Sequence, residues 1–153
     1  MLMKAKRTVD DAFGVEVTAT TILSPEAAAY ELRRGGGGDA NDNPIAGQNY
    51  VYYFRVEAHT MRYRVTGDGL PRDLASNINT SIHPDGQPNV LQMKVRGDTI
   101  WVGVNDVALG TVTMPRPTGQ PRTIGLIATM LGPSSQRDVQ IRFRDFAIYA
   151  LNS

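Results

Sequence analysis

The chain contains no cysteine among its 153 residues, which excludes disulfides, cysteine-ligated zinc sites and thiol catalysis. It also lacks any apolar run near the roughly 18 residues that a membrane-spanning helix needs, so we expect no membrane insertion. The chain also lacks an excess of charge of either sign: the formal net charge is +1, which provides no overall electrostatic field for binding nucleic acid. The only two histidines, His59 and His83, have no obvious third ligand or orienting carboxylate, which argues against a histidine metal site or a catalytic triad.

The first residues, MLMKAKRTVDDAF, contain no apolar segment of the kind that a signal peptide has. Two interpretations stay open: a cytoplasmic protein, or part of a longer exported or anchored chain, and we favour the second. The length suits one domain over residues 1–153, with enough apolar residues to bury a core.

Most of the sequence alternates between apolar and polar residues, which predicts strands with one buried face and one wet face. The inward phase gives the expected core, which comprises Phe54, Val56, Tyr63, Leu91, Met93, Val95, Ile100, Val102, Val104, Ile124, Leu126, Ile141, Phe143 and Phe146. Many short strands separated by turn signals indicate an all-β sandwich or barrel.

Turn signals separate these strands. Gly97-Asp98 and Asn105-Asp106 each predict a two-residue hairpin turn. The segment PEAAAYELRR from Pro25 could form a helix by propensity, but the neighbouring pattern favours a turn at Ser24–Ala28 and then a strand over Ala29–Arg33. Residues 35–48, GGGGDANDNPIAGQ, predict a long flexible loop within the domain.

Four segments, taken in order, carry a resemblance to a known family: YELRRG, NYVYYFRVEAHTMRYRV, NVLQMKVRGDTIWVGVNDVALGTV and TIGLIATMLGPSSQRDVQIRFRDFAIYAL. Together they resemble the concanavalin A-like lectin and glucanase domains, and more narrowly the laminin G-like modules of bacterial extracytoplasmic proteins. The resemblance runs from about Phe13 to Leu151. It implies a two-sheet antiparallel jelly roll, a fold in which many relatives bind carbohydrate on one sheet. Asp106 departs from the family, which usually has glycine at that position.

The polar phase of the strands supplies the candidate ligand-binding residues. Trp101, the only tryptophan, falls in this phase, where an aromatic ring could stack on a sugar or anchor a partner. The other candidates are Tyr53, Arg55, Arg62, Arg64, Lys94 and Arg142, with Arg96 and Arg144 in the same phase. If their strands share one sheet, the face is rich in arginine and suits an acidic glycan. The alternative is an ordinary solvated surface, on which Trp101 packs under a loop or against arginine side chains.

Asp39, Asn41 and Asn43 place oxygen ligands at alternating positions, which is typical of a calcium site. The positions that an EF-hand loop would need hold Pro44 and Tyr50 instead, so any calcium site would be of another type. The alternative is a flexible polar loop. No other cofactor is expected.

Some relatives of this fold are glycosidases, which need two carboxylates flanking a cleft. The four glutamates, Glu16, Glu26, Glu31 and Glu57, show no such pairing along the sequence, and we therefore expect no enzyme activity. The leading hypothesis is a non-catalytic carbohydrate-binding module. A structural or protein-interaction domain is the second hypothesis, and a glycoside hydrolase is the third.

Overall fold

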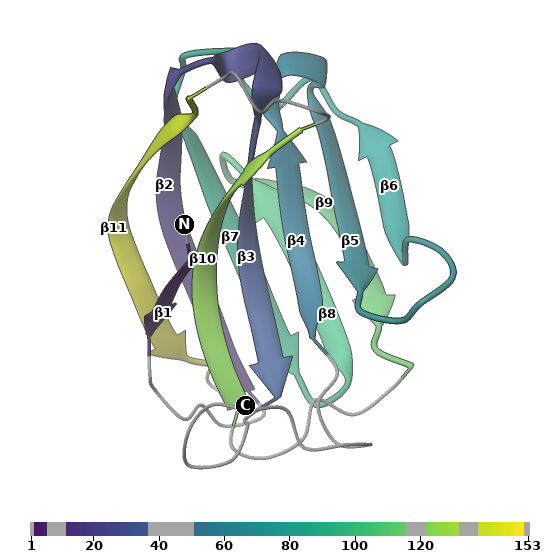
Figure 1. Cartoon of the computed structure of the whole chain (residues 1–153). Coiled ribbons are helices and arrows are strands. Elements are labelled where there is room, and N and C mark those ends of the chain that lie inside the picture. The colour runs from purple at the N-terminus through teal and green to yellow at the C-terminus, as the bar shows by residue number, and fades with distance from the viewer. Residues whose placement is uncertain (1, 6–11, 37–50, 116–121, 132–137, 152–153) are drawn as a thin grey trace.

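The computed structural model describes residues 2–5, 12–36, 51–115, 122–131 and 138–151, and these form two packed antiparallel sheets (Figure 1). The first sheet has six strands in the order β1 (Leu2–Ala5), β10 (Arg122–Met130), β3 (Ala28–Gly36), β4 (Tyr52–Glu57), β5 (Arg62–Gly67) and β6 (Ala75–Ile78). The second has five strands in the order β11 (Gln140–Ala150), β2 (Ala12–Leu23), β7 (Asn89–Arg96), β8 (Thr99–Val104) and β9 (Val107–Thr113). The predicted all-β sandwich is confirmed.

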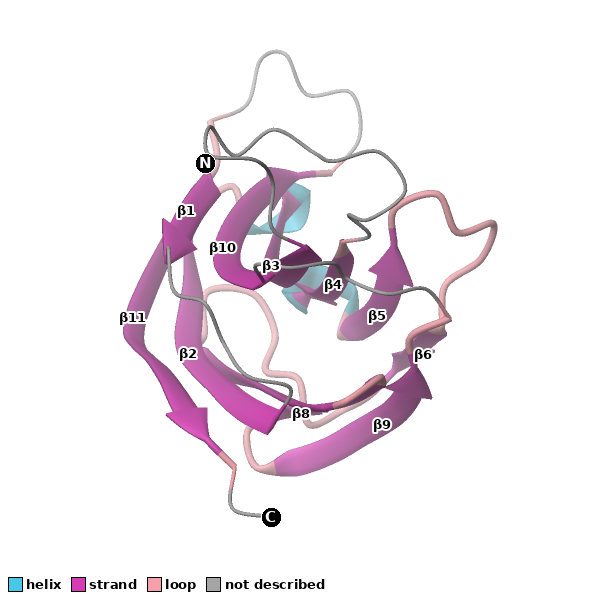
Figure 2. Ribbon diagram, turned by 90° about the horizontal axis from the view of Figure 1, so that it is seen from below, coloured by secondary structure: helices cyan, strands magenta, loops and turns pink. Residues whose placement is uncertain are grey.

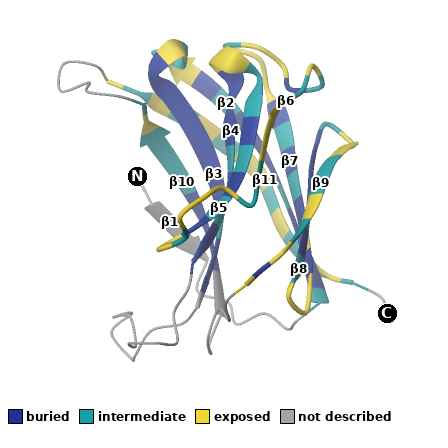
Figure 3. Cartoon of the chain, turned by 90° about the vertical axis from the view of Figure 1, so that its right-hand side faces the viewer, coloured by how far each residue is buried: buried dark blue, intermediate teal, exposed yellow. Residues whose placement is uncertain are grey.

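Buried and exposed residues alternate along many of the strands (Figure 3), and the buried side chains form the core between the two sheets. Eleven of the fourteen expected core residues are buried, from Phe54 to Leu126. The other three, Ile141, Phe143 and Phe146, pack against the core but stay partly exposed. All three lie on β11, an edge strand, and an edge strand has a neighbour to cover it on one side only.

The predicted turns are confirmed. Asn105 and Asp106 both have positive φ, 51° and 65°, as a type I′ hairpin requires. A 3₁₀ helix, Pro25–Ala27, replaces the longer helix that propensity alone would favour, and β3 follows it directly. Because β3 continues to Gly36, the expected loop starts two residues later than Gly35. The rest of that loop lies outside the described residues.

Two polar side chains occupy inward positions that the sequence analysis did not assign to the core. Arg34 is 1% exposed, and its guanidinium carbon lies 4.8 Å from the centre of the Phe13 ring. Burial lowers the pKa of Arg34 to about 10. Asn89 is fully buried, and its Nδ2 donates a hydrogen bond of 2.7 Å to the hydroxyl of Tyr30. Since Tyr30 is on β3 and Asn89 on β7, this bond joins the two sheets.

The outer faces of the two sheets point in opposite directions (Figure 2). We call them the six-strand face and the five-strand face. The described residues contain no helix long and apolar enough to cross a membrane.

Candidate functional site

The six-strand face carries a cluster of charged side chains at the centre of its sheet. The strand register places Glu31 of β3, Arg55 of β4 and Arg64 of β5 side by side in one row. Glu57 follows two positions along β4 and therefore points outward on the same face, opposite Arg62. Two of these charged groups, Glu31 and Glu57, are glutamates that the sequence spacing left unpaired.

These groups form a continuous ion-pair network. Arg55 donates from Nε to Oε1 of Glu31 at 2.8 Å, and its Nη2 lies 2.7 Å from the same oxygen. Oε1 of Glu57 lies 3.8 Å from Arg55 Nη1 and 3.4 Å from Arg64 Nε. Arg64 then donates from Nη1 to Oδ2 of Asp73 at 3.3 Å. Each guanidinium therefore contacts two carboxylates, which fixes both arginines in place.

The two glutamates are nearly inaccessible although they lie on an outer face. Glu31 is 4% exposed and Glu57 is 8% exposed, whereas Arg55 and Arg64 are partly exposed. Carboxylates removed from water in this way are stable only when paired. The arginines therefore both neutralise the carboxylates and keep hydrogen-bond donors available at the surface.

Tyr53 and Arg62 extend the cluster along the sheet. The Tyr53 hydroxyl donates to Oδ2 of Asp68 at 3.3 Å, and burial, followed by the charge of Asp68, raises the pKa of this tyrosine. Arg62 donates from Nη1 to the hydroxyl of Ser76 at 3.2 Å. Four of the predicted site residues, Tyr53, Arg55, Arg62 and Arg64, are thus brought together on the six-strand face.

The other predicted residues lie on the opposite side of the molecule. Trp101 is on β8 and Lys94 is its direct partner on β7, while Arg142 is on β11, so all three belong to the five-strand face. The prediction that Trp101 and Tyr53 share one arginine-rich face is therefore wrong. Alternation assigns a residue to the outer side of its strand, but it does not tell which of two sheets the strand joins.

Trp101 covers bare backbone on its own strand. A Cβ atom placed on Gly103 would lie 2.7 Å from Cη2 of Trp101, so the indole ring rests where Gly103 has no side chain. Lys94 Nζ lies 4.8 Å from the centre of the ring, a cation–π distance. The partly exposed tryptophan is therefore packed against a cationic side chain, but this cation is Lys94 and not an arginine as the alternative interpretation expected.

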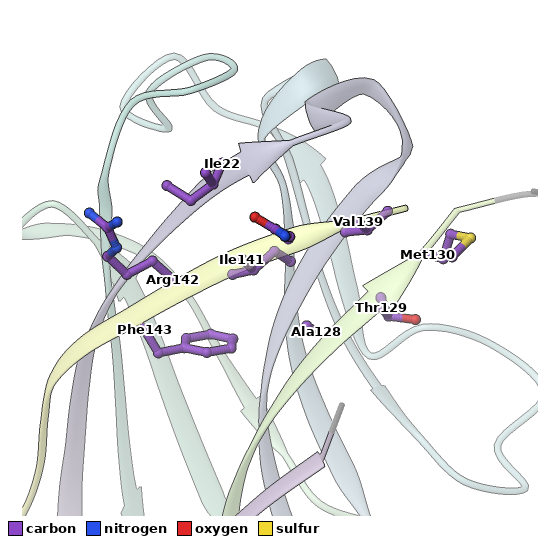
Figure 4. A pocket seen from close by; sticks show the side chains of 9 residues that line it. Ile22, Ala128, Thr129, Met130, Val139, Ile141, Arg142 and Phe143 are labelled. Atoms are coloured by element: carbon purple, nitrogen blue, oxygen red, sulfur yellow. The ribbon is translucent and has the colours of Figure 1, made fainter. Parts of the chain in front are cut away.

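Arg142 lines an apolar groove of about 590 Å³ between β10 and β11 (Figure 4). Ile22 and Met130, both largely exposed, lie on opposite sides of this groove. The remaining lining residues are Ala128, Thr129, Val139, Gln140, Ile141 and Phe143. Arg142 is thus separated from Trp101 and Lys94 on its own face.

The residues predicted to hold calcium, Asp39, Asn41 and Asn43, lie outside the described residues. Within the described part of the chain, no three histidine, aspartate or glutamate side chains gather closely enough to hold a metal ion.

One expectation about the histidines is wrong. His59 does have an orienting carboxylate, because its Nδ1 lies 2.6 Å from Oδ2 of Asp85. This hydrogen bond, and then the charge of Asp85, raises the pKa of His59. His83 instead places its Nδ1 2.8 Å from the carbonyl of Pro88. Both side chains are exposed.

No protein-family model matches the sequence, and no curated protein matches it either. Solved structures do match. Sheep galectin-11, solved in a complex with glycerol, is 16% identical with a TM-score of 0.57, and the match covers 94% of this chain and 96% of that one. The fold is a concanavalin A-like jelly roll.

Both non-enzymatic proteins and enzymes share this jelly roll. The carbohydrate-binding module CBM66 from Bacillus subtilis is 13% identical with a TM-score of 0.60, over 92% of this chain and 76% of that one. The β-glucanase of Bacillus licheniformis is 8% identical with a TM-score of 0.64, over 97% and 70%. At such identities the likeness concerns the fold alone, and the chemistry must be argued from this chain's own residues.

Proposed function

We propose that the protein is a non-catalytic carbohydrate-binding module whose site is the six-strand face. The observation that carries this proposal is the network of Arg55 and Arg64 with Glu31, Glu57 and Asp73. It presents fixed donors and acceptors on an open sheet, which is what a ligand with many hydroxyl groups requires. The fold is one that the galectin and the carbohydrate-binding module share, and this supports the same class of ligand.

The network suits sugar recognition because it is preorganised. Arg55 and Arg64 are held by carboxylates before any ligand arrives, so little side-chain entropy is lost on binding. Donors of the guanidinium groups that point to solvent can bind sugar oxygens, and the exposed carboxylate of Asp73 can accept from a sugar hydroxyl. Tyr53 adds an aromatic ring beside them for the apolar side of a sugar.

We further propose that the ligand of this face is a neutral sugar. Within the network, the two arginines Arg55 and Arg64 meet three carboxylates, those of Glu31, Glu57 and Asp73. The network itself therefore has no excess of positive charge to attract an acidic glycan. The sequence analysis expected an acidic glycan on the condition that the strands carrying these basic residues share one sheet, and the strand order divides them between two sheets.

An enzymatic role is less well supported by this face. A glycosidase needs one of its two carboxylates to donate a proton. Glu31 and Glu57 are instead paired with guanidinium donors, an arrangement in which a carboxylate accepts hydrogen bonds.

We also propose, from the sequence resemblance alone, that the module is laminin G-like and works in a longer bacterial chain outside the cytoplasm.

The test is a glycan array probed with the wild type, Arg64→Gln and Arg72→Gln. Arg72 lies in an exposed loop, so its variant loses the same charge without touching the network. We expect the wild type and Arg72→Gln to retain the same neutral glycans. Arg64→Gln should bind them about tenfold more weakly, since hydrogen bonds to charged groups contribute about 1.5–3 kcal/mol.

Other outcomes would contradict the proposal. A blank array for the wild type would favour the protein-interaction hypothesis. Equal binding by Arg64→Gln and the wild type would place the site elsewhere. Release of reducing ends from any retained oligosaccharide would favour the hydrolase.

A further inference from the structure

The five-strand face contains a separate groove beside Trp101. It has a volume of about 420 Å³ and is lined by Lys94, Val95, Arg96, Thr99, Trp101 and Leu151. This volume falls within the range of about 300–1,000 Å³ that is usual for small-molecule sites. Among the residues that the structure describes, the lining contains two basic side chains and no carboxylate, unlike the six-strand face.

Lys94 provides a positive charge in this groove. Its ammonium is positioned by the Trp101 ring, 4.8 Å away, and not by a counter-ion. Among the residues that the structure describes, no carboxylate lies within ion-pair distance of Lys94. An ammonium held by a neutral ring keeps its charge available for an anion.

Two further features of the groove indicate which chemical groups the anion must carry besides its negative charge. Trp101 and Leu151 provide apolar surface in the same groove. The Thr99 hydroxyl donates to Asp98 Oδ1 at 3.4 Å, which leaves the Thr99 oxygen able to accept a hydrogen bond. A ligand that meets the whole lining therefore carries a negative charge, an apolar side and hydroxyl donors.

We propose that this groove binds a uronic acid unit of a polysaccharide. The carboxylate would pair with Lys94, the apolar side of the sugar ring would contact Trp101 and Leu151, and a sugar hydroxyl would donate to Thr99. The proposal does not depend on the function of the six-strand face, because the two sites lie on opposite sides of the sandwich.

An acidic peptide fits this groove less well. Extended peptides usually bind a sheet by adding a strand at its edge, where backbone groups are open. Lys94 and Trp101 lie on β7 and β8, and both of these strands are already paired on both sides. A peptide here would have to bind through side chains alone.

The experiment uses Trp101 itself as the reporter, since it is the only tryptophan in the chain. The protein is titrated at low ionic strength with trimers of galacturonate, glucuronate and mannuronate, while tryptophan emission and heat of binding are recorded. We expect saturable binding of at least one trimer, a loss of affinity at high salt, and no binding of its methyl ester. Lys94→Gln should bind about tenfold more weakly by calorimetry.

Two variants serve as controls. Arg72→Gln has the same change in net charge in an exposed loop and should bind the trimer like the wild type. Arg64→Gln should also bind it like the wild type, which separates this site from the six-strand face. The thermal unfolding temperature of Lys94→Gln should match that of the wild type, because the side chain is exposed.

The proposal fails if no trimer binds, if the methyl ester binds equally well, or if Lys94→Gln keeps the wild-type affinity. It also fails if polyglutamate changes the emission at lower concentration than every uronate trimer, since the groove would then be a site for acidic protein.

Discussion

At the scale of single residues, two polar side chains lie inside the sandwich, at strand positions where the apolar–polar alternation predicts apolar residues. Arg34 is in phase with Tyr30 and Leu32, and Asn89 is in phase with Leu91 and Met93. The sequence therefore held a signal that both point inward. It could not supply their partners, because the bond between Asn89 and Tyr30 joins residues 59 positions apart.

Asn89 gives a prediction at this scale. Its Oδ1 accepts from the His83 backbone at 2.7 Å and from Asn105 Nδ2 at 2.9 Å, while its Nδ2 donates to Tyr30 and to the His83 carbonyl. Asn89→Ala leaves several buried groups without partners and should destabilise the protein by about 2–3 kcal/mol in urea unfolding.

Tyr30→Phe is the matched control for Asn89→Ala. It removes one of these bonds and leaves the link from Asn89 to His83, so we expect a loss of about 1 kcal/mol. Equal losses for the two variants would show that the inter-sheet bond, and not the whole set around Asn89, carries the stability.

At the scale of elements, the strands and hairpins could be predicted because their signals are local. Alternation identified most of the strands but missed β1 and β6. The two-residue turns at Gly97-Asp98 and Asn105-Asp106 set the β7–β8 and β8–β9 registers. The pairing of β3 with β4 has no such local signal, because residues 37–50 separate them. For this reason Glu31 could not be placed beside Arg55 from the sequence.

The link between His59 and Asp85 gives a prediction at the element scale. It ties the 3₁₀ helix Ala58–Thr60 to the turn before β7. Because the pKa of His59 is raised in the folded protein, its stabilisation is fully present below the unfolded value of about 6.5 and is lost as the pH rises through the folded value. The pair is exposed, so the effect should stay below about 1 kcal/mol.

The measurement compares unfolding temperatures at pH 5.5 and pH 8.5. His59→Gln should lower the unfolding temperature at pH 5.5 and have little effect at pH 8.5. His83→Gln, which removes the histidine that contacts a carbonyl and not a carboxylate, is the control and should show no such difference. An equal effect of His59→Gln at both values would mean that the charge of His59 does not stabilise the fold.

At the scale of the whole molecule, the fold class followed from the sequence but the division of the polar residues between two surfaces did not. Each strand's outward residues were correctly identified as polar, yet Trp101 and Tyr53 ended on opposite sides. Strand order is set by packing between distant segments, and no pattern within one strand reports it. The sequence therefore predicted the outward side of most strands, although it missed that Arg34 and Asn89 are buried, and it could not predict which outward residues act together.

The opposed outer faces have a mechanical consequence. The two proposed sites lie on opposed faces, so a protein that holds a neutral glycan on one face and a uronate on the other would act as a cross-linker of two polymers. We expect the wild type to co-precipitate a neutral polysaccharide with a polyuronate. Arg64→Gln and Lys94→Gln should each lose this bridging while keeping the ligand of the intact face. A single folded domain, rather than a dimer, would then suffice to join two components of a matrix.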